Sequence, residues 1–350
     1  MAELLSTFNH SRFQPGTAGG FYESYFQRAN HPTRPLAFWI RYTIFCPKGR
    51  PNDAIGELWA IYFDGERNTH VVAKSEFPVG QFVFSREGLN ARIGEAILEP
   101  GGLQGRAESR GHRIDWDLSY KDGQRPLFLL DPWLYDFWFP KAKALVGVPL
   151  ARYDGRLVVD GRDVDIDGWV GSQNHNWGSA HTDLYAYGQV AGFDHAADSF
   201  LEVSTARVKV GPLRTPLLTT LVLRHGGEEF ALNTIAQALF RASGRFGFVS
   251  AKDCRPTDVG RHSDAAVWTF RSHRKGVSVE GEIAAPKEAF VGLRYHNPPG
   301  GQKWCLNSKI ASCRLTLSRE GQPPEVLETR NRAAFEILTD DLGHGVEIRT

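Results

Sequence analysis

The chain has 350 residues, a formal net charge of +1, 12% aromatic residues and four cysteines. The near-neutral charge gives no support to nucleic acid or an anionic membrane as a partner, because these select for an excess of basic side chains. No Cys-x-x-Cys pair occurs, which argues against a zinc knuckle, and four cysteines in a chain of this length do not indicate a disulfide scaffold. The length predicts two domains.

The sequence shows no targeting or membrane segment. The beginning, "MAELLSTFNHSRF", lacks the basic and apolar regions of a signal peptide. The longest apolar run, "PLLTTLVL", is far shorter than the roughly 20 residues of a membrane-spanning helix. We therefore expect a soluble cytoplasmic protein without stable membrane insertion.

Alternating residues and turn signals in the first half predict antiparallel strands. In "RIDWDLSYKDGQ", one face carries the apolar residues Ile114, Trp116, Leu118 and Tyr120. "ELWAIYFDGE" and "RLVVDGRDVDI" also read as strands that run into tight turns. Five Asp-Gly dipeptides, which favour hairpin turns, begin at Asp64, Asp122, Asp154, Asp160 and Asp167.

Two segments depart from this pattern. "LLDPWLYDFWFPKAKALVG" (129–147) is apolar and punctuated by proline, which favours a lid or a packed connection over a strand. In the second half, "NTIAQALFRA" (233–242) is compatible with a helix between segments that otherwise read as strands. The chain thus divides into two β-rich units, residues 1–180 and 181–350. Closed antiparallel barrels suit units of this size, and a pair of sandwiches with filled cores is the alternative.

One stretch between the two units is rich in hydrogen-bonding side chains and indoles. "GWVGSQNHNWGSAH" (168–181) holds two Trp, two His, two Asn, one Gln and two Ser. A surface loop would more often use Lys and Glu. We therefore expect this stretch to line a buried pocket.

Two blocks carry a family resemblance. "GGFYESYFQRA" (19–29) resembles the aromatic, acidic first-strand motif of the group that contains carotenoid 1,2-hydratase, tocopherol cyclase and AttH-like proteins. "QNHNWG" (173–178) resembles the block of that group in which a His is followed two residues later by Trp and then Gly. The resemblance implies an all-β fold of two tandem lipocalin-like antiparallel β-barrels. It also implies a large apolar substrate of prenyl, polyene or terpenoid type.

The sequence departs from the hydratases of this group at the expected acid. These enzymes are thought to use an acidic residue on the strand after the His-x-Trp-Gly block. Here that strand, "DLYAYGQVAGF", has Tyr185, Tyr187 and Gln189 at its centre. Asp183 stands at its start, and Glu202 lies on the next strand. The resemblance therefore does not supply the proton donor.

The residues nevertheless suit acid catalysis by a cofactor-independent hydratase, cyclase or isomerase. A carboxylic acid in an apolar pocket has a raised pKa, and indole faces stabilise a cation. The candidate catalytic residues are Glu23, His175 and Tyr185. The candidate substrate-binding residues are Trp39, Trp133, Trp138, Trp169, Gln173, Asn174, Trp177 and Tyr187.

Other readings stay open at this point. Glu23 on a strand is often exposed or paired with an Arg, for which Arg41 is available, and the alternative for His175 is a structural role that ties a loop to backbone carbonyls. A lipocalin-like carrier could hold the same apolar ligand unchanged, and a purely structural role is a third reading. No zinc spacing, GxSxG, GxGxxG or P-loop motif occurs, so we expect no metal and no nucleotide cofactor. The oligomeric state does not follow from the sequence.

Overall fold

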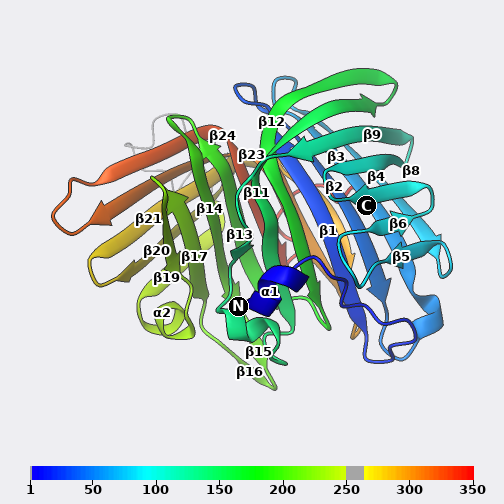
Figure 1. Ribbon diagram of the computed structural model, residues 1–350, viewed down its shortest axis with the longest axis horizontal. Coiled ribbons are helices and arrows are strands. Elements are labelled where there is room, and N and C mark those ends of the chain that lie inside the picture. Colours follow the sequence, from blue (N-terminus) through cyan, green and yellow to red (C-terminus); the bar gives the residue numbers. More distant parts are fainter. Residues whose placement is uncertain (1, 250–263) are drawn as a thin grey trace.

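The computed structural model describes residues 2–249 and 264–350, which form two large antiparallel sheets (Figure 1). The strands of the first sheet are β1 (Phe21–Asn30), β2 (Leu36–Cys46), β3 (Ile55–Asp64), β4 (Thr69–Pro78), β5 (Phe82–Phe84), β6 (Ala91–Ile93), β7 (Ala96–Glu99), β8 (Gly102–Ser109), β9 (His112–Lys121), β10 (Leu127–Phe128), β11 (Ala142–Val159) and β12 (Arg162–Gly178). Their order is β4-β3-β2-β1-β12-β11-β9-β8-β7-β6-β5, with β10 paired to β11.

The strands of the second sheet are β13 (Leu184–Phe193), β14 (Ala196–Arg207), β17 (Leu218–His225), β18 (Glu228–Leu232), β19 (Ala242–Val249), β20 (Ala265–Arg274), β21 (Val277–Pro286), β22 (Val291–His296), β23 (Gln302–Arg319) and β24 (Glu325–Thr339). Their order is β18-β17-β14-β13-β24-β23-β21-β20-β19, with β22 paired to β23. A short hairpin, β15 (Lys209–Val210) and β16 (Leu213–Arg214), follows β14. The helical segments are α1 (Ala2–Thr7), α2 (Ile235–Phe240), η1 (Pro51–Asp53), η2 (Pro132–Tyr135) and η4 (Lys287–Ala289).

The first sheet curls until β4 approaches β8 and β9. The backbone N–H of Lys74 donates to Ser109 Oγ at 3.0 Å, and the N–H of Glu108 donates to Ser75 Oγ at 2.9 Å. A twisted sheet that bends this far encloses a core, and here aromatic residues fill it. Trp116 Nε1, for example, donates to the Tyr42 hydroxyl at 2.9 Å inside the barrel.

The second sheet curls in the same way around its own core. The Trp268 indole on β20 donates to Thr205 Oγ1 on β14 at 3.1 Å, which joins strands far apart in the sheet order. Both barrels therefore have filled interiors. This all-β architecture agrees with the expected fold class.

Several local expectations are tested by the strands themselves. On β9, the predicted apolar face of Ile114, Trp116, Leu118 and Tyr120 is buried, and its neighbours are more exposed, which confirms the alternation. The helix expected within 233–242 is α2. The segment 129–147 is a connection only as far as residue 141, because β11 begins at Ala142 and continues through Gly147.

The Asp-Gly signals have two different outcomes. Asp160 and Gly161 form the tight turn between β11 and β12, with φ of 50° and 79°. Asp154–Gly155 and Asp167–Gly168 instead lie inside β11 and β12, so a hairpin prediction at these two positions is wrong. A register shift occurs between Tyr153 and Gly155, which identifies a β-bulge.

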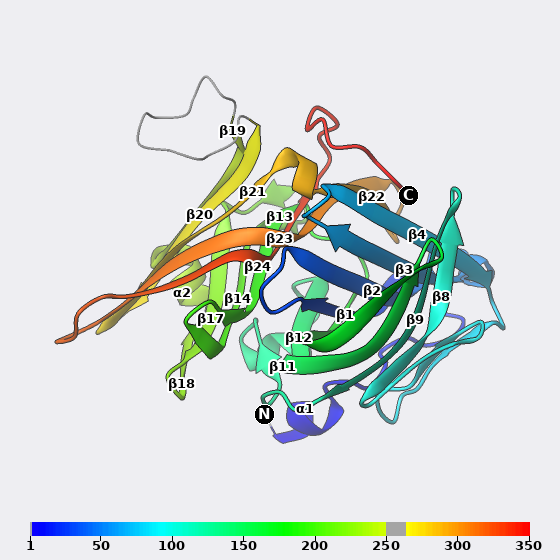
Figure 2. The ribbon, with the colours of Figure 1, turned by 90° about the horizontal axis from the view of Figure 1, so that it is seen from above.

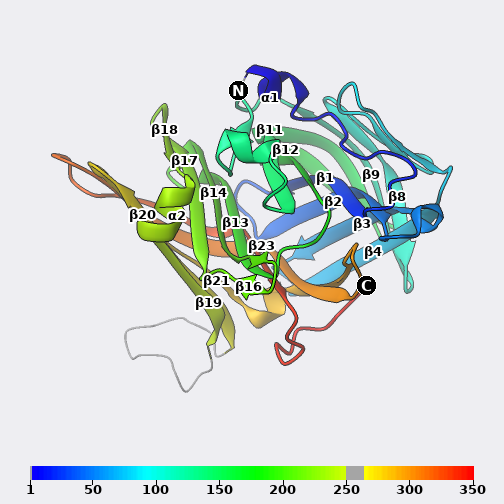
Figure 3. The same cartoon turned by 90° about the horizontal axis from the view of Figure 1, so that it is seen from below.

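The sheets meet along β1, β2 and β12 of the first and β13, β23 and β24 of the second (Figure 2). Residues 179–183 link the sheets, and the expected boundary between 180 and 181 falls in this link. The division into two domains stays a prediction. Seen from below, the segment between β10 and β11 lies between α2 and the first sheet (Figure 3).

Candidate functional site

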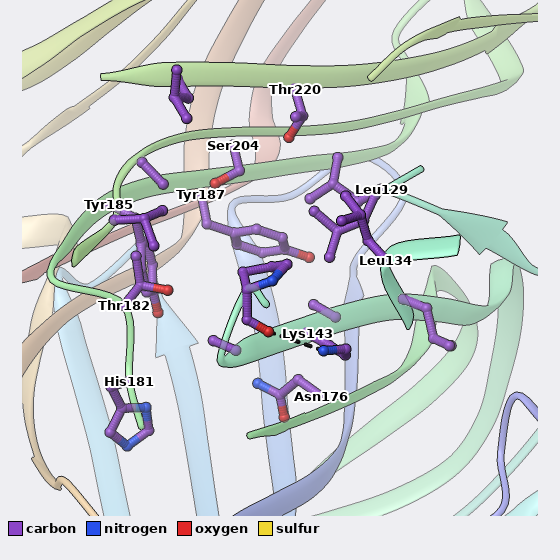
Figure 4. A pocket seen from close by; sticks show the side chains of 18 of the residues that line it. Leu129, Leu134, Lys143, Asn176, His181, Thr182, Tyr185, Tyr187, Ser204 and Thr220 are labelled. Carbon is purple, nitrogen blue, oxygen red and sulfur yellow. Dashed lines mark hydrogen bonds between the residues drawn. The ribbon is translucent and has the colours of Figure 1, made fainter. Parts of the chain in front are cut away.

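A cavity of about 360 Å³ lies between the two sheets. It is outside both barrel cores, and its walls come from β1, β2, β11 and β12 on one side and from β13, β14, β17, β22 and β24 on the other. Side chains of α2 and of the connection before β11 complete it, and Figure 4 shows Leu129 and Leu134 on the same side of the cavity as the Tyr187 hydroxyl. This volume is in the range of pockets that hold drug-sized apolar ligands.

The central strands are buried on both faces, because one face meets a barrel core and the other meets the cavity. Successive side chains of a strand point to opposite faces, so β1 sends Tyr22 and Phe26 to the cavity and Glu23 and Tyr25 into the first barrel. On β13, Tyr185 and Tyr187 face the cavity, whereas the Gly188 position faces Trp268 and Ile283 in the second barrel.

Glu202 on β14 is the most notable titratable group in the wall, because it is 1% exposed and has no cation within ion-pair distance among the described residues. Its Oε2 accepts hydrogen bonds from Gln189 Nε2 at 2.8 Å and from the Tyr187 hydroxyl at 3.3 Å. Burial raises the pKa of the Glu202 carboxyl to about 8, since the charged form loses its hydration. Such a group keeps its proton near neutral pH and can donate it.

A hydrogen-bond network orients this carboxyl. Gln189 Nε2 also lies 2.9 Å from Asn174 Oδ1, and Gln189 Oε1 accepts from Ser172 Oγ at 2.6 Å. The Asn174 amide in turn donates to Ser172 Oγ at 2.9 Å. Because Ser172 and Asn174 belong to β12 and Gln189 to β13, the network holds Glu202 against both sheets at once.

Arg41 and His181 occupy another part of the wall. The Arg41 guanidinium lies 4.8 Å from the ring centroid of Tyr295. The His181 ring packs against Tyr22 with centroids 4.2 Å apart and the ring planes tilted by 31°, and its Nε2 lies 3.1 Å from the carbonyl oxygen of His296. Since a carbonyl only accepts, Nε2 carries the hydrogen. Burial, together with the charge of Arg41, lowers the pKa of His181 to about 3, so the imidazole is neutral.

A second carboxyl in the wall, Glu336 on β24, is already paired. Its Oε1 lies 2.7 Å from Lys309 Nζ and accepts from Asn307 Nδ2 at 3.3 Å. Lys309 is fully buried, which lowers the pKa of its ammonium group. This ion pair leaves Glu202 as the better candidate for a proton donor in the cavity.

The structure places four of the sequence-predicted site residues in the cavity wall. They are Trp39, Asn174, Tyr185 and Tyr187. Burial raises the pKa of both tyrosines well above the usual value, so their hydroxyls stay protonated and can donate hydrogen bonds. The polar stretch 168–181 therefore contributes to the cavity through alternate residues, among them Asn174, Asn176 and His181.

The other predicted site residues lie elsewhere. Glu23 and His175 pair with each other on the barrel face of β1 and β12 and do not line this cavity. Gln173 exchanges hydrogen bonds with Asn9 on the same face. Trp169 belongs to the core of the first barrel, Trp177 packs against Leu4 and Tyr135, and Trp133 and Trp138 are exposed by 50% and 70%.

Three residues of the cavity wall, Glu202, Arg41 and His181, are absent from the site residues that the sequence predicts. Glu202 was visible as an acid on the strand after β13, but nothing in "SFLEVSTARVKVG" shows that its carboxyl faces a cavity. Successive side chains of β14 alternate between its two faces, and near Glu202 both faces are buried. The sequence pattern therefore does not identify the face that meets the cavity.

Two absences hold for residues 2–249 and 264–350. Within these ranges, no group of three or more His, Cys, Asp or Glu side chains is arranged to hold a metal ion. In the same part of the chain, no helix has the length and hydropathy needed to cross a membrane.

Comparison with known proteins gives structural matches only. No family model and no curated protein sequence matches the chain. A structure from Nitrosomonas europaea that carries the name AttH matches with a TM-score of 0.55 and 13% identity, over 94% of this chain and 98% of the other.

Two more solved structures match over nearly the whole chain. Kievitone hydratase from Nectria haematococca has a TM-score of 0.51 and 11% identity, over 93% of this chain and 91% of the other. CghA with Sch210972 has a TM-score of 0.54 and 11% identity, over 95% of this chain and 94% of the other. The chain therefore has the tandem lipocalin-like fold of AttH-type proteins, as the blocks at 19–29 and 173–178 predict.

Proposed function

We propose that this protein is an acid catalyst for a large apolar substrate of prenyl, polyene or terpenoid type, with hydratase, cyclase or isomerase chemistry in the cavity between the sheets. The observation that carries the proposal is Glu202, a buried carboxyl that lines an apolar cavity and has a pKa of about 8. The reaction needs only a proton and, for hydration, one water molecule, so the proposal requires no cofactor.

The chemistry follows from the position of the proton. Glu202 transfers its proton to one carbon of a substrate double bond, and the other carbon becomes cationic. The rings of Tyr187 and Tyr185, which line the cavity, are the candidates to stabilise that charge. In a hydration, a water oxygen bonds to the cation and the water proton returns to the Glu202 carboxylate. In a cyclisation, a second nucleophilic atom of the substrate replaces water and returns its proton.

His181 adds a neutral hydrogen-bond acceptor at another part of the cavity. Its Nε2 hydrogen faces the His296 carbonyl, so Nδ1 keeps its lone pair. We propose that this nitrogen accepts a hydrogen bond from the attacking water or substrate hydroxyl. Strongly shifted pKa values, here those of Glu202 and His181, often occur together at functional sites.

The fold and the cysteines supply further support. One structure with this fold is named a hydratase, and its likeness covers 93% of the chain. Among the described residues, Cys46, Cys305 and Cys313 are free and buried. Free thiols are usual in a reducing compartment, which supports the cytoplasm as the proposed location.

The test compares the bound compounds of the wild type with those of Glu202→Gln, which keeps the side-chain volume and removes the acid. Each protein is purified from its native host and extracted with organic solvent, and the extract is analysed by mass spectrometry. We expect the variant to hold an apolar precursor, and the wild type to hold its isomer or the compound with one added water. The exposed Glu87→Gln serves as the control and should match the wild type.

The outcome also decides between enzyme and carrier. If both proteins hold the same compound unaltered, the acid role of Glu202 is wrong and the protein is a carrier of a hydrophobic ligand. Incubation of the purified precursor with each protein then tests independently for catalysis, because an enzyme converts the precursor and a carrier does not.

A further inference from the structure

Arg41 is a buried cation without an anionic partner. It lies on β2, is 5% exposed and lines the cavity. Its Nη2 donates to Ser24 Oγ at 2.6 Å, but its Nε has no hydrogen-bond partner, and within the described ranges it forms no ion pair. Burying an ion without a partner is costly, so proteins normally pair such a group or use it to bind something.

The groups in contact with the Arg41 guanidinium are aromatic, and the two carboxylates that act on it from further away, Glu57 and Glu336, are paired with Lys74 and Lys309. The guanidinium lies 4.8 Å from the Tyr295 centroid and 5.9 Å from that of Trp39. Burial and the Arg41 charge keep His181 uncharged. These rings contact the guanidinium through their faces, and they leave its hydrogen-bonding edge without an acceptor at Nε.

The wider balance of buried charge between the sheets is positive. Lys309 is matched by Glu336 at 2.7 Å. Arg28, which is 1% exposed, donates instead to neutral oxygens, those of the Asn30 side chain and the Arg332 carbonyl. Glu202 holds its proton below about pH 8, and Glu57 and Glu336 are paired with Lys74 and Lys309, so among the described residues neither Arg28 nor Arg41 forms an ion pair with a carboxylate.

Two hydroxyl donors stand near Arg41. Tyr22 and Tyr185 line the cavity, and neither hydroxyl makes a hydrogen bond to another described residue. Burial raises the pKa of both, so both keep their protons and act as donors. A guanidinium edge and two phenolic donors form a set that recognises an anionic oxygen.

We propose that the substrate of this cavity carries an anionic oxygen group, a carboxylate, enolate or phenolate, and that Arg41 binds it with help from Tyr22 and Tyr185. The inference rests on the proposed function and narrows its substrate class to apolar molecules with one acidic group. An anion in the same cavity also disfavours loss of the Glu202 proton, so binding of the acidic group keeps the catalytic acid in its active form.

The test measures binding rather than turnover. Decanoate and 1-decanol share an apolar tail and differ in charge, and isothermal titration calorimetry at pH 7 gives both affinities. We expect the wild type to prefer decanoate by about tenfold or more, the typical value of a charged hydrogen bond. Arg41→Met should lose this preference by weakening decanoate alone, and Arg41→Gln should lose most of it.

Two control variants separate the possible causes. Arg294 is exposed on β22, so Arg294→Met removes the same charge from the protein and should keep the preference. Glu202→Gln should also keep it, because this variant removes the acid and not the anion site. Circular dichroism verifies the fold of each variant before titration.

Each failure has a distinct meaning. If the wild type binds both probes equally, or if Arg41→Met and Arg41→Gln both keep the preference for decanoate, the anion site is wrong while the acid role of Glu202 stands. If neither probe binds the wild type, the anion site and the apolar cavity of the proposed function are both wrong.

Discussion

His175 Nε2 on β12 lies 2.8 Å from Glu23 Oε1 on β1, and both side chains are fully buried. Glu23 also accepts from the Ser11 hydroxyl at 2.6 Å and from the backbone N–H of Phe13 at 2.9 Å. His175 Nδ1 lies 2.7 Å from the carbonyl of Phe8. The pair thus fastens the segment before β1 to the first barrel.

This arrangement predicts a stability effect at Glu23 and His175. Glu23→Ala and His175→Ala each leave the buried partner and the N-terminal segment without hydrogen bonds, so each should lower the free energy of unfolding by about 3–5 kcal/mol. Urea denaturation followed by tryptophan fluorescence measures the change. Glu95, 90% exposed beside Arg106, is the control, and Glu95→Ala should change stability by less than about 1 kcal/mol.

The same variants also test whether the pair acts in the cavity. Folded Glu23→Ala protein at low temperature should bind decanoate as tightly as the wild type and convert ligand as fast, because Glu23 does not line the cavity. A stable variant that had lost ligand conversion would contradict this prediction and return Glu23 to the catalytic role that its sequence context suggests.

Glu202 predicts how stability depends on pH. Its pKa is raised to about 8 in the folded protein from 4.5, so between these values the folded state binds more protons than the unfolded state. The stabilising contribution is complete below about pH 4.5 and is lost as pH rises through 8. Urea midpoints of wild type and Glu202→Gln at pH 5, 7 and 9 measure this, and the wild type should lose stability relative to the variant as pH rises.

Exposed carboxyls provide the comparison for that series. Glu87→Gln should follow the wild type at every pH, because Glu87 is exposed. A constant difference between wild type and Glu202→Gln from pH 5 to 9 would mean that the Glu202 carboxyl titrates normally, and the acid role would lose its physical basis.

Gly171 predicts a packing limit at the centre of the first sheet. A Cβ at this position would lie 1.7 Å from the carbonyl oxygen of Arg28 on the neighbouring strand. Gly171→Ala therefore forces β12 away from β1 and should lower the free energy of unfolding by about 1–3 kcal/mol or more. Gly247 on β19 has no atom within 4 Å of its Cβ position, so Gly247→Ala should be tolerated. Thermal melts of the two variants measure this difference. Equal melting temperatures for Gly171→Ala and Gly247→Ala would contradict the prediction.

The N-terminus of α2 predicts a local effect at the cavity. Thr234 Oγ1 accepts from the backbone N–H of Gln237, and the Gln237 side chain reaches back to the Thr234 N–H. Thr234→Ala removes the cap at a cost of about 1 kcal/mol, whereas Thr234→Ser keeps it. Hydrogen exchange of the α2 amides should become faster in the alanine variant alone. Equal exchange in both variants would show that packing, not the cap, holds α2.

The fold was largely predictable because its signals are local. Alternation on β9, the turn at Asp160 and the two motif blocks each depend on neighbouring residues, and together they indicate antiparallel barrels. The bulge between Tyr153 and Gly155, opposite Asp167 and Gly168, was not predictable, because Asp-Gly accepts the same backbone angles inside a strand as in a turn.

The site was predicted only in part, for a geometric reason. The stretch from Gln173 to Trp177 alternates between the first barrel and the cavity, so its polar residues divide into two groups with different surroundings. Sequence reasoning treated them as one wall. Only the packing of the second sheet against β1 and β12 decides that Asn174 meets the cavity and His175 does not.

The cavity takes its wall from both sheets, so neither half of the chain contains a complete site. A bound ligand therefore acts as a non-covalent crosslink between residues 21–178 and 184–339. By mass action, a ligand at a hundred times its Kd adds about 2.7 kcal/mol to the native state. The ligand stabilises only the state in which both sheets are folded. Saturating ligand should therefore make the two sheets melt in one cooperative transition.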